Sequence, residues 1–317
     1  MGTILSLILK RIGLGIVSLI AVSMIIFFAV ELLPGDLAEA ILGQNATPET
    51  LEAMRRDLGL DRVATTRYFE WVWGVLQGDL GESLASGRDV GELIGTRFGA
   101  TIFLAIFAAL ISVPLALVLG MATALFRNTR FDRAANASAL FAISFPEFFI
   151  GYLLIYLLAQ NGFFPTMARI TEDMNLGQRL HSTFLPALTL TFVVAGYMMR
   201  MTRAAILNVL SAPYVEMARL KGVRPRNVIL RHALPNAASP IVNVISLSLA
   251  YLITGVVMVE VVFVYPGVGQ LLVDSVVRRD LPVIQGVSLL FASIYILLNL
   301  SADVISMLSN PRILHGR

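Results

Sequence analysis

Three acidic residues lie inside long apolar runs of the sequence: Glu147, Glu260 and Asp303. A charged side chain at mid-depth in a bilayer costs about 2.5–3.5 kcal/mol on insertion scales, so each acid needs a reason to be there. Glu147 follows Pro146, a residue that frees a backbone carbonyl in a helix. We therefore predict that Glu147 faces a polar path through the membrane.

We predict different roles for the other two acids. Glu260 lies near the outer end of its run and shortly before Pro266 and Gly267, where either a gate or a structural turn fits. Asp303 lies near the inner end of the last run, and a structural ion pair is expected there. The candidate partners are Arg200, Arg203 and Arg312.

Sets of residues that carry out catalysis are missing. The chain has no Cys, no G-x-x-x-x-G-K-[ST] motif and no His-Glu-x-x-His motif. His181 has no second His or acid nearby at ligand spacing, so no metal site is predicted. The chain is therefore expected to bind no cofactor itself, and any energy source must lie on another subunit.

Composition places these residues in a membrane protein. Hydrophobic residues make up 57% of the 317, charged residues only 14%, and the apolar residues gather in runs of about 20, the length that crosses a bilayer. We predict an all-α protein with a single domain over residues 1–317. A signal peptide is the rival reading of the first run, which exceeds the roughly 7–15 apolar residues of such a segment. The six predicted spans are residues 12–30, 100–126, 137–159, 184–201, 238–263 and 283–308.

Charge bias in the loops sets the orientation. Cytoplasmic loops of membrane proteins carry an excess of Lys and Arg. When both termini are placed in the cytoplasm, the inner side carries many basic residues and only two acids, Asp132 and Glu216. The outer loop of residues 33–99 then holds most of the acids. The inner basic residues are Lys10, Arg11, Arg127, Arg130, Arg133, Arg200, Arg203, Arg219, Lys221, Arg224, Arg226, Arg231, Arg312 and Arg317.

The outer loop predicts two helices. Thr47-Pro48-Glu49 supplies an N-cap, a proline at the first helical position and an acid in the first turn, and Gly59 ends that helix. Residues 67–77 carry Tyr68, Phe69, Trp71 and Trp73, which suit the headgroup layer. These helices either pack on the outer ends of the spans or contact a delivery protein.

A basic stretch, residues 214–235, lies within the cytoplasmic loop 202–237. Ser211 and Pro213 open a short helix, and Gly222 supplies a left-handed C-cap. Tyr214, Met217 and Ala218 share one predicted face, and Arg224-Pro225-Arg226 is read as a second turn. The loop either docks another protein or only sets topology by attracting anionic headgroups. The predicted docking residues are Tyr214, Glu216, Met217, Ala218, Arg219, Lys221, Gly222 and Arg224.

These motifs together resemble one family. Glu216-Met217-Ala218, Gly222 and His232-Ala233-Leu234-Pro235 are similar to the "EAA" loop of bacterial ABC-importer permeases, and the chain resembles the dipeptide/oligopeptide-type group, which includes nickel and glutathione permeases. Further matches occur in the same order as in the family, and they extend this resemblance along nearly the whole chain. They include residues 33–36 (LPGD), 58–61 (LGLD), 78–81 (GDLG), 185–190 (LPALTL), 266–267 (PG), 279–280 (RD) and 310–312 (NPR).

The resemblance implies a fold and partners. It implies a type I ABC importer permease with six spans in the bacterial inner membrane, whose coupling helix docks on an ATPase subunit. A second homologous permease, two ATP-binding cassette subunits that hold ATP and Mg, and a periplasmic substrate-binding protein are implied as partners; nucleic acid is not. The solute would be a peptide or a similar small molecule. Met217 stands where the pattern has Ala, and Glu147 where relatives have a small residue.

Two other classes of protein remain as alternatives. An ion-gradient-driven secondary transporter or channel usually shows inverted repeats and broken helices at mid-depth, and neither is clear in this sequence. A membrane enzyme needs convergent polar groups, which are missing here.

Overall fold

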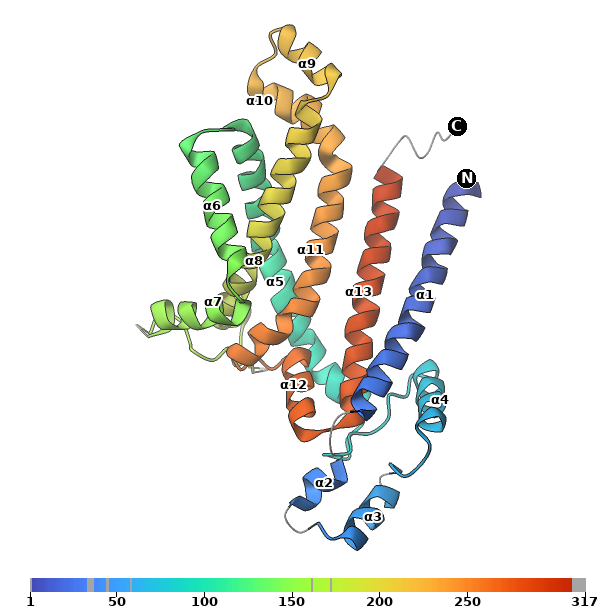
Figure 1. Cartoon of the computed structure of the whole chain (residues 1–317). Coiled ribbons are helices and arrows are strands. Elements are labelled where there is room, and N and C mark those ends of the chain that lie inside the picture. Colours follow the sequence, from blue (N-terminus) through green and yellow to red (C-terminus); the bar gives the residue numbers. More distant parts are fainter. Residues whose placement is uncertain are drawn as a thin grey trace.

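The protein is a bundle of long helices that run roughly along a common axis (Figure 1). The computed structural model describes residues 2–32, 37–43, 46–57, 59–160, 162–171 and 173–309. These residues form no strand, and their one isolated β-bridge joins Glu82 to Asp89. The all-α prediction is confirmed. The elements are α1 (Gly2–Glu31), α2 (Leu37–Leu42), α3 (Pro48–Asp57), α4 (Ala64–Leu76), α5 (Val90–Leu125), α6 (Arg130–Ser144), α7 (Glu147–Leu154), η2 (Ile155–Ala159), α8 (Leu176–Leu210), α9 (Pro213–Leu220), α10 (Pro225–Asn227), η3 (Val228–Ala233), α11 (Leu234–Val262), α12 (Val268–Arg278) and α13 (Leu281–Ser309).

Five helices in the described part of the chain are long and apolar enough to cross a membrane. Each overlaps a predicted span, and several extend well beyond the predicted bounds because polar helical turns continue outside the apolar stretch. The five are Ile8–Val30, Val90–Leu125, Leu176–Leu210, Pro225–Val262 and Leu281–Ile305.

The predicted third span, residues 137–159, is interrupted by a bend. α6 ends at Ser144, and the following helix, Glu147–Ala159, is bent from it by 104°. The cause is Pro146, which disfavours helical geometry at the residue before it; Phe145 is accordingly extended, with φ −101° and ψ 142°. With 15 residues α6 is about 22 Å long, less than the thickness of the hydrocarbon core. α6 therefore crosses only part of a membrane, and α7 lies across the bundle (Figure 1).

The two ends of the bundle differ in charge. The N-terminal end of α1, the start of α6 and the pair α9 and α10 lie at one end, called here the basic end, and α2, α3, α4 and α12 lie at the other (Figure 1). The predicted inner arginines of these elements, among them Arg130, Arg219 and Arg226, fall at the basic end. This arrangement agrees with the orientation predicted from loop charge.

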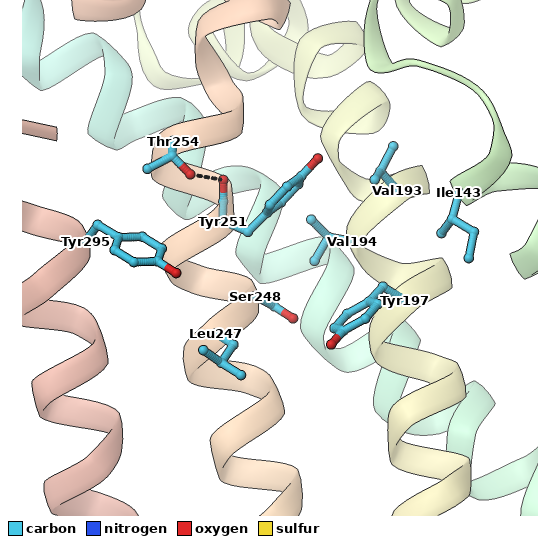
Figure 2. Close-up of a pocket in the computed structure, with 9 residues that line it drawn as sticks. All are labelled: Ile143, Val193, Val194, Tyr197, Leu247, Ser248, Tyr251, Thr254 and Tyr295. Atoms are coloured by element: carbon cyan, nitrogen blue, oxygen red, sulfur yellow. Dashed lines mark hydrogen bonds between the residues drawn. The ribbon is translucent and has the colours of Figure 1, made fainter. Parts of the chain in front are cut away.

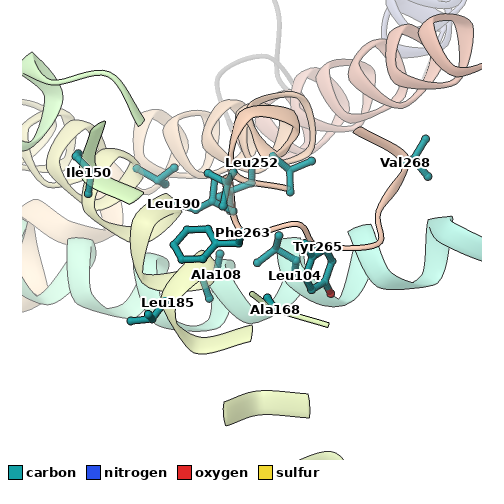
Figure 3. Close-up of a cluster of buried hydrophobic side chains, with 14 of the residues drawn as sticks. Leu104, Ala108, Ile150, Ala168, Leu185, Leu190, Leu252, Phe263, Tyr265 and Val268 are labelled. Carbon is teal, nitrogen blue, oxygen red and sulfur yellow. The ribbon is translucent and has the colours of Figure 1, made fainter. Parts of the chain in front are cut away.

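The main apolar core lies between α5, α8, α11 and the turn that follows α11. Leu104, Leu190 and Leu252 are 1% exposed or less, and Phe263 and Tyr265 are fully buried (Figure 3). The Tyr265 hydroxyl donates to the carbonyl oxygen of Ala100 at 2.7 Å. This core fixes the outer ends of α5, α8 and α11 relative to one another.

The outer-loop helices form where the sequence predicts them. Thr47 Oγ1 accepts a hydrogen bond from the Thr50 amide, and Gly59, with φ +64°, follows α3. Tyr68 of α4 is 5% exposed and contacts Ser23 of α1 through a 2.9 Å hydroxyl–hydroxyl hydrogen bond. Of the four aromatic residues in α4, Tyr68 and Trp71 contact Phe27 of α1, while Phe69 and Trp73 are exposed. α4 thus packs on the outer end of α1.

Candidate functional site

A sharp elbow at the basic end, residues 211–224, carries the predicted docking helix. α9 begins with Pro213 at its first position and ends at Lys221, the C-cap. Gly222 has φ +78°; its amide donates to the Arg219 carbonyl at 2.9 Å, and the Val223 amide donates to the Ala218 carbonyl at 3.2 Å. This pair of hydrogen bonds is the Schellman motif, which requires a left-handed residue that glycine adopts without strain. Gly222 therefore sets the angle at which α9 leaves the bundle.

The two faces of α9 differ strongly. Val215 and Ala218 are buried against the bundle, whereas Tyr214, Met217 and Leu220 are 46%, 54% and 75% exposed. The prediction that Ala218 shares a face with Tyr214 and Met217 is wrong, because the helix turns Ala218 inward. The exposed row at positions i, i+3 and i+6 is an apolar strip. The charged predicted docking residues Glu216, Arg219, Lys221 and Arg224 are also exposed.

The elbow is joined directly to the membrane core. Residues 225–262 form one 38-residue helix, about 57 Å long, so Arg224-Pro225-Arg226 is a helix start and not the predicted second turn. A second apolar cluster at the basic end contains Ile206 of α8, Ile229 of η3 and Ala124 of α5. Arg219, Val228 and Leu210 help to line a cavity of about 460 Å³ under the elbow. α9 is thus followed, after a short turn, by one helix that continues into α11.

A pocket of about 420 Å³ lies between α6, α8, α11 and α13, below the elbow in the membrane region (Figure 2). Its walls are mostly apolar, and they also carry three tyrosines, one serine and one threonine. The lining residues are Ile143, Val193, Val194, Tyr197, Leu247, Ser248, Tyr251, Thr254 and Tyr295.

Glu147 is not among the residues that line this pocket, but it is hydrogen-bonded to one of them. The Tyr251 hydroxyl, from α11, donates a hydrogen bond to Glu147 Oε1. The same oxygen lies 3.6 Å from the position that a Cβ would take on Gly255, one turn further along α11. Glu147 is partly exposed and stands at the first position of α7, where the helix dipole favours an acid. The bend at Phe145 thus brings a carboxylate to Tyr251, a residue of the pocket wall.

Glu260 has a different environment. It is fully buried; its carboxylate accepts from Thr101 Oγ1 at 2.7 Å and from the Gln270 amide at 3.0 Å. Gln270 is the third residue of α12, so Glu260 caps the N-terminus of that helix from the end of α11. Gly267 is also buried, and a Cβ there would collide with the Glu260 carboxylate. Of the two readings, gate and structural turn, the structure favours the turn for Glu260, Pro266 and Gly267.

Thr101→Val tests this structural role. Valine keeps the shape of threonine but removes the donor to Glu260 and the acceptor of the Val268 amide, which lies 2.8 Å from Thr101 Oγ1. We expect the loss of about 1–3 kcal/mol of stability, because two buried polar groups lose a partner. Thermal unfolding in detergent measures it. Thr96→Val, on the same helix, removes only an exposed hydrogen bond to Leu93 and should have little effect. Equal effects of the two variants would contradict a structural role for the Thr101–Glu260 hydrogen bond.

The predicted ion pair of Asp303 with Arg200 or Arg203 is wrong. Asp303 pairs with Arg11 of α1 at 3.0 Å, since α13 packs beside α1 and not beside the end of α8. Arg203 instead forms two hydrogen bonds of 2.8 Å to the two oxygens of Asp132, which is 3% exposed. Arg312 lies outside the described residues.

Sequence reasoning missed Asp132, Thr101 and Tyr251. Asp132 had a signal, because it is one of only two acids among the inner basic residues, and a buried acid there needs a cation. Thr101 and Tyr251 had none, since their partners lie 159 and 104 residues away in the chain. Motif residues 33–36, 58 and 310–312 lie outside the described residues.

Membrane-spanning helices, a structured elbow at the basic end and a pocket at membrane depth together define a multi-pass membrane protein of the transport class. Residues 112–315 match the family model described as "Binding-protein-dependent transport system inner membrane component", and residues 4–105 match the model described as "Binding-prot-dependent transport system membrane comp, N-term". The chain therefore belongs to this family of inner-membrane permease subunits, as the motifs predict.

Similar proteins agree with this placement. The glutathione transport system permease protein GsiC of Salmonella typhimurium (strain LT2) is 40% identical over 311 residues, covering 98% of this chain and 99% of that protein. A Brucella abortus (strain 2308) protein, named as a peptide transport system permease, is 36% identical over 310 residues, or 97% and 98%. A chain of the inward-facing MetNI methionine ABC transporter superposes with a TM-score of 0.53 at 18% identity, covering 70% of this chain and 94% of that one. This last likeness shows the fold.

Proposed function

We propose that this permease imports peptides or glutathione-like solutes in a complex with a second, similar permease, two ATPase subunits and a binding protein that delivers the solute. The names of the peptide and glutathione relatives, at 36% and 40% identity, support the solute class. ATP and Mg belong to the ATPase subunits. In this proposal the chain itself supplies half of the path and one lever that moves it.

One observation carries the proposal: α9 presents an exposed apolar strip on an arm that projects from the basic end (Figure 1). Tyr214, Met217 and Leu220 together expose a patch with charged residues beside it, the pattern of a protein-docking surface. A loop that only set topology would need the charge but neither the apolar strip nor the Schellman cap.

The continuous helix of residues 225–262 supports a mechanical role for this arm. It starts beside the elbow, passes the pocket at Tyr251 and carries Glu260 in its last turn, where Glu260 is hydrogen-bonded to α5 and α12. When the ATPases close on ATP, α9 moves with them, and the helix carries the movement to the pocket. Two discrete arrangements of the bundle, open to the inside or to the outside, then alternate.

Reconstitution tests the proposed function. The complete transporter in proteoliposomes should take up labelled trialanine or glutathione only with ATP and the loaded binding protein. An ionophore that collapses ion gradients should not change the rate. Uptake driven by an ion gradient without the ATPase subunits would overturn the proposal in favour of a secondary transporter.

A further inference from the structure

We propose that the pocket bounded by α6, α8, α11 and α13 is a solute subsite that binds a protonated amino group, with Glu147 as its charge partner. The inference rests on the proposed function and names the chemical feature of the solute that this chain recognises. Four features of the pocket point to it.

The first feature is an acid with no basic partner. Among the described residues no ion pair includes Glu147, and its hydrogen-bond partner is the neutral hydroxyl of Tyr251. The other intramembrane acids differ: Asp303 has Arg11, and Glu260 is enclosed by its own hydrogen bonds. A carboxylate at membrane depth carries a large desolvation cost that a passing cation would offset.

The second feature is the charge and ring content of the pocket wall. The wall contains no Lys or Arg, and it carries three aromatic rings: Tyr197, Tyr251 and Tyr295. The faces of such rings attract an ammonium group, and the attraction grows when the site is dry. An anionic end of the solute would find no partner here. The wall therefore selects for positive charge.

The third feature is an unpaired buried hydroxyl. Ser248 is 3% exposed, yet its Oγ has no hydrogen-bond partner within the described structure. Figure 2 shows this side chain directed from α11 toward the space beside α8, where Tyr197 stands. A buried hydroxyl without a partner costs about 1–3 kcal/mol, so a ligand that supplies a carbonyl or an amide would be favoured here.

The fourth feature is size. A volume of about 420 Å³ lies within the range of small-molecule sites, roughly 300–1,000 Å³. It is sufficient for the amino end of a short peptide. The amine would lie near Glu147 and the ring of Tyr251, and the first peptide group near Ser248.

The absence of Cys from the chain provides a direct test. Gly255 lies one turn after Tyr251 on α11, and a Cβ there would lie 3.6 Å from Glu147 Oε1, so Gly255→Cys places the only thiol of this chain beside the acid. In the assembled transporter without ATP, the thiol is reacted with a cationic or an anionic methanethiosulfonate. The increase in the mass of this chain gives the rate of each reaction. The ratio of the cationic rate to the anionic rate should exceed the same ratio for a free thiol by about tenfold or more.

Glu147→Gln should bring this preference back to that of a free thiol. The variant is expected to fold, because an amide oxygen accepts the Tyr251 hydrogen bond as a carboxylate does. The matched control is Asp303→Asn, which removes a different intramembrane acid away from the pocket and should leave the preference unchanged. An unreactive thiol, or a preference that survives Glu147→Gln, would overturn the inference.

A second readout identifies the ligand chemistry. Trialanine should slow the reaction of the thiol, and N-acetyltrialanine should do so at least about tenfold less well, since it lacks the charged amine. Equal protection by both peptides, or protection by neither, contradicts the amine site. These rates need no ATP, so a failure here leaves the proposed ATP-driven import standing, and a failure of uptake leaves these rates unaffected.

Discussion

Gly222→Leu is expected to lower ATP-driven uptake by about tenfold or more while the protein still inserts and binds its partner permease. Gly222 has φ +78°, a conformation that costs a residue with a side chain about 1–2 kcal/mol. Open space surrounds the position of its missing Cβ, so the effect comes from the backbone and not from a collision. When the Schellman cap is lost, α9 leaves the bundle at a different angle and its exposed strip no longer meets the ATPase.

The chain contains a matched control for this variant. Gly59 ends α3 with φ +64°, and the amides of Gly59 and Leu60 donate to the carbonyls of Arg56 and Arg55, the same pattern as at Gly222. Gly59→Leu therefore carries the same local strain at the opposite end of the bundle, and it should retain coupled ATP hydrolysis and uptake. Equal losses in both variants, or unchanged uptake with Gly222→Leu, would refute the coupling role of α9.

Arg203→Ala should be the most destabilising of the substitutions considered. It leaves Asp132, 3% exposed, without the guanidinium that holds both of its oxygens at 2.8 Å. Removing one partner of a buried ion pair costs about 3–5 kcal/mol, because the remaining charge stays buried and unpaired. We expect the thermal midpoint of the purified protein to fall by about 10 °C.

Two comparisons make this result specific. Asp132→Asn combined with Arg203→Gln removes both charges and should recover much of the lost stability, since no charge is left unpaired. Arg11→Ala breaks the pair with Asp303, whose side chains are 52% and 36% exposed, and should cost at most about 1 kcal/mol. If Arg203→Ala were no worse than Arg11→Ala, α6 and α8 would not depend on the Asp132–Arg203 pair.

Local signals in the sequence predicted the helix ends well. The Thr47 cap, the end of α3 at Gly59 and the left-handed Gly222 all follow from residue types within one turn of chain. The apolar runs predicted the long helices, because burial in lipid depends on length and composition alone. The position of α9, which carries the predicted docking residues, followed from a motif whose spacing a single helix sets.

Longer-range features could not be predicted in the same way. Whether Pro146 kinks a helix or ends it depends on what replaces the lost hydrogen bonds, and here the chain turns by 104° at Phe145. The partners of Asp303 and Glu147 depend on which helices lie side by side, which no short motif encodes. Glu260 and Glu147 are both acids within apolar runs, yet one caps a helix in the core and the other is bonded to a tyrosine of the pocket wall.

The central claim is that α9 docks on an ATP-hydrolysing subunit, and crosslinking tests it most directly. Met217→Cys places the only thiol of this chain on the exposed strip, and Val215→Cys places one on the buried face of the same helix. With a bifunctional thiol reagent, the account predicts that position 217 joins this chain to a co-purifying ATPase subunit and that position 215 does not. Lipid labelling at position 217, or purified complexes that contain no ATPase subunit, would contradict the claim.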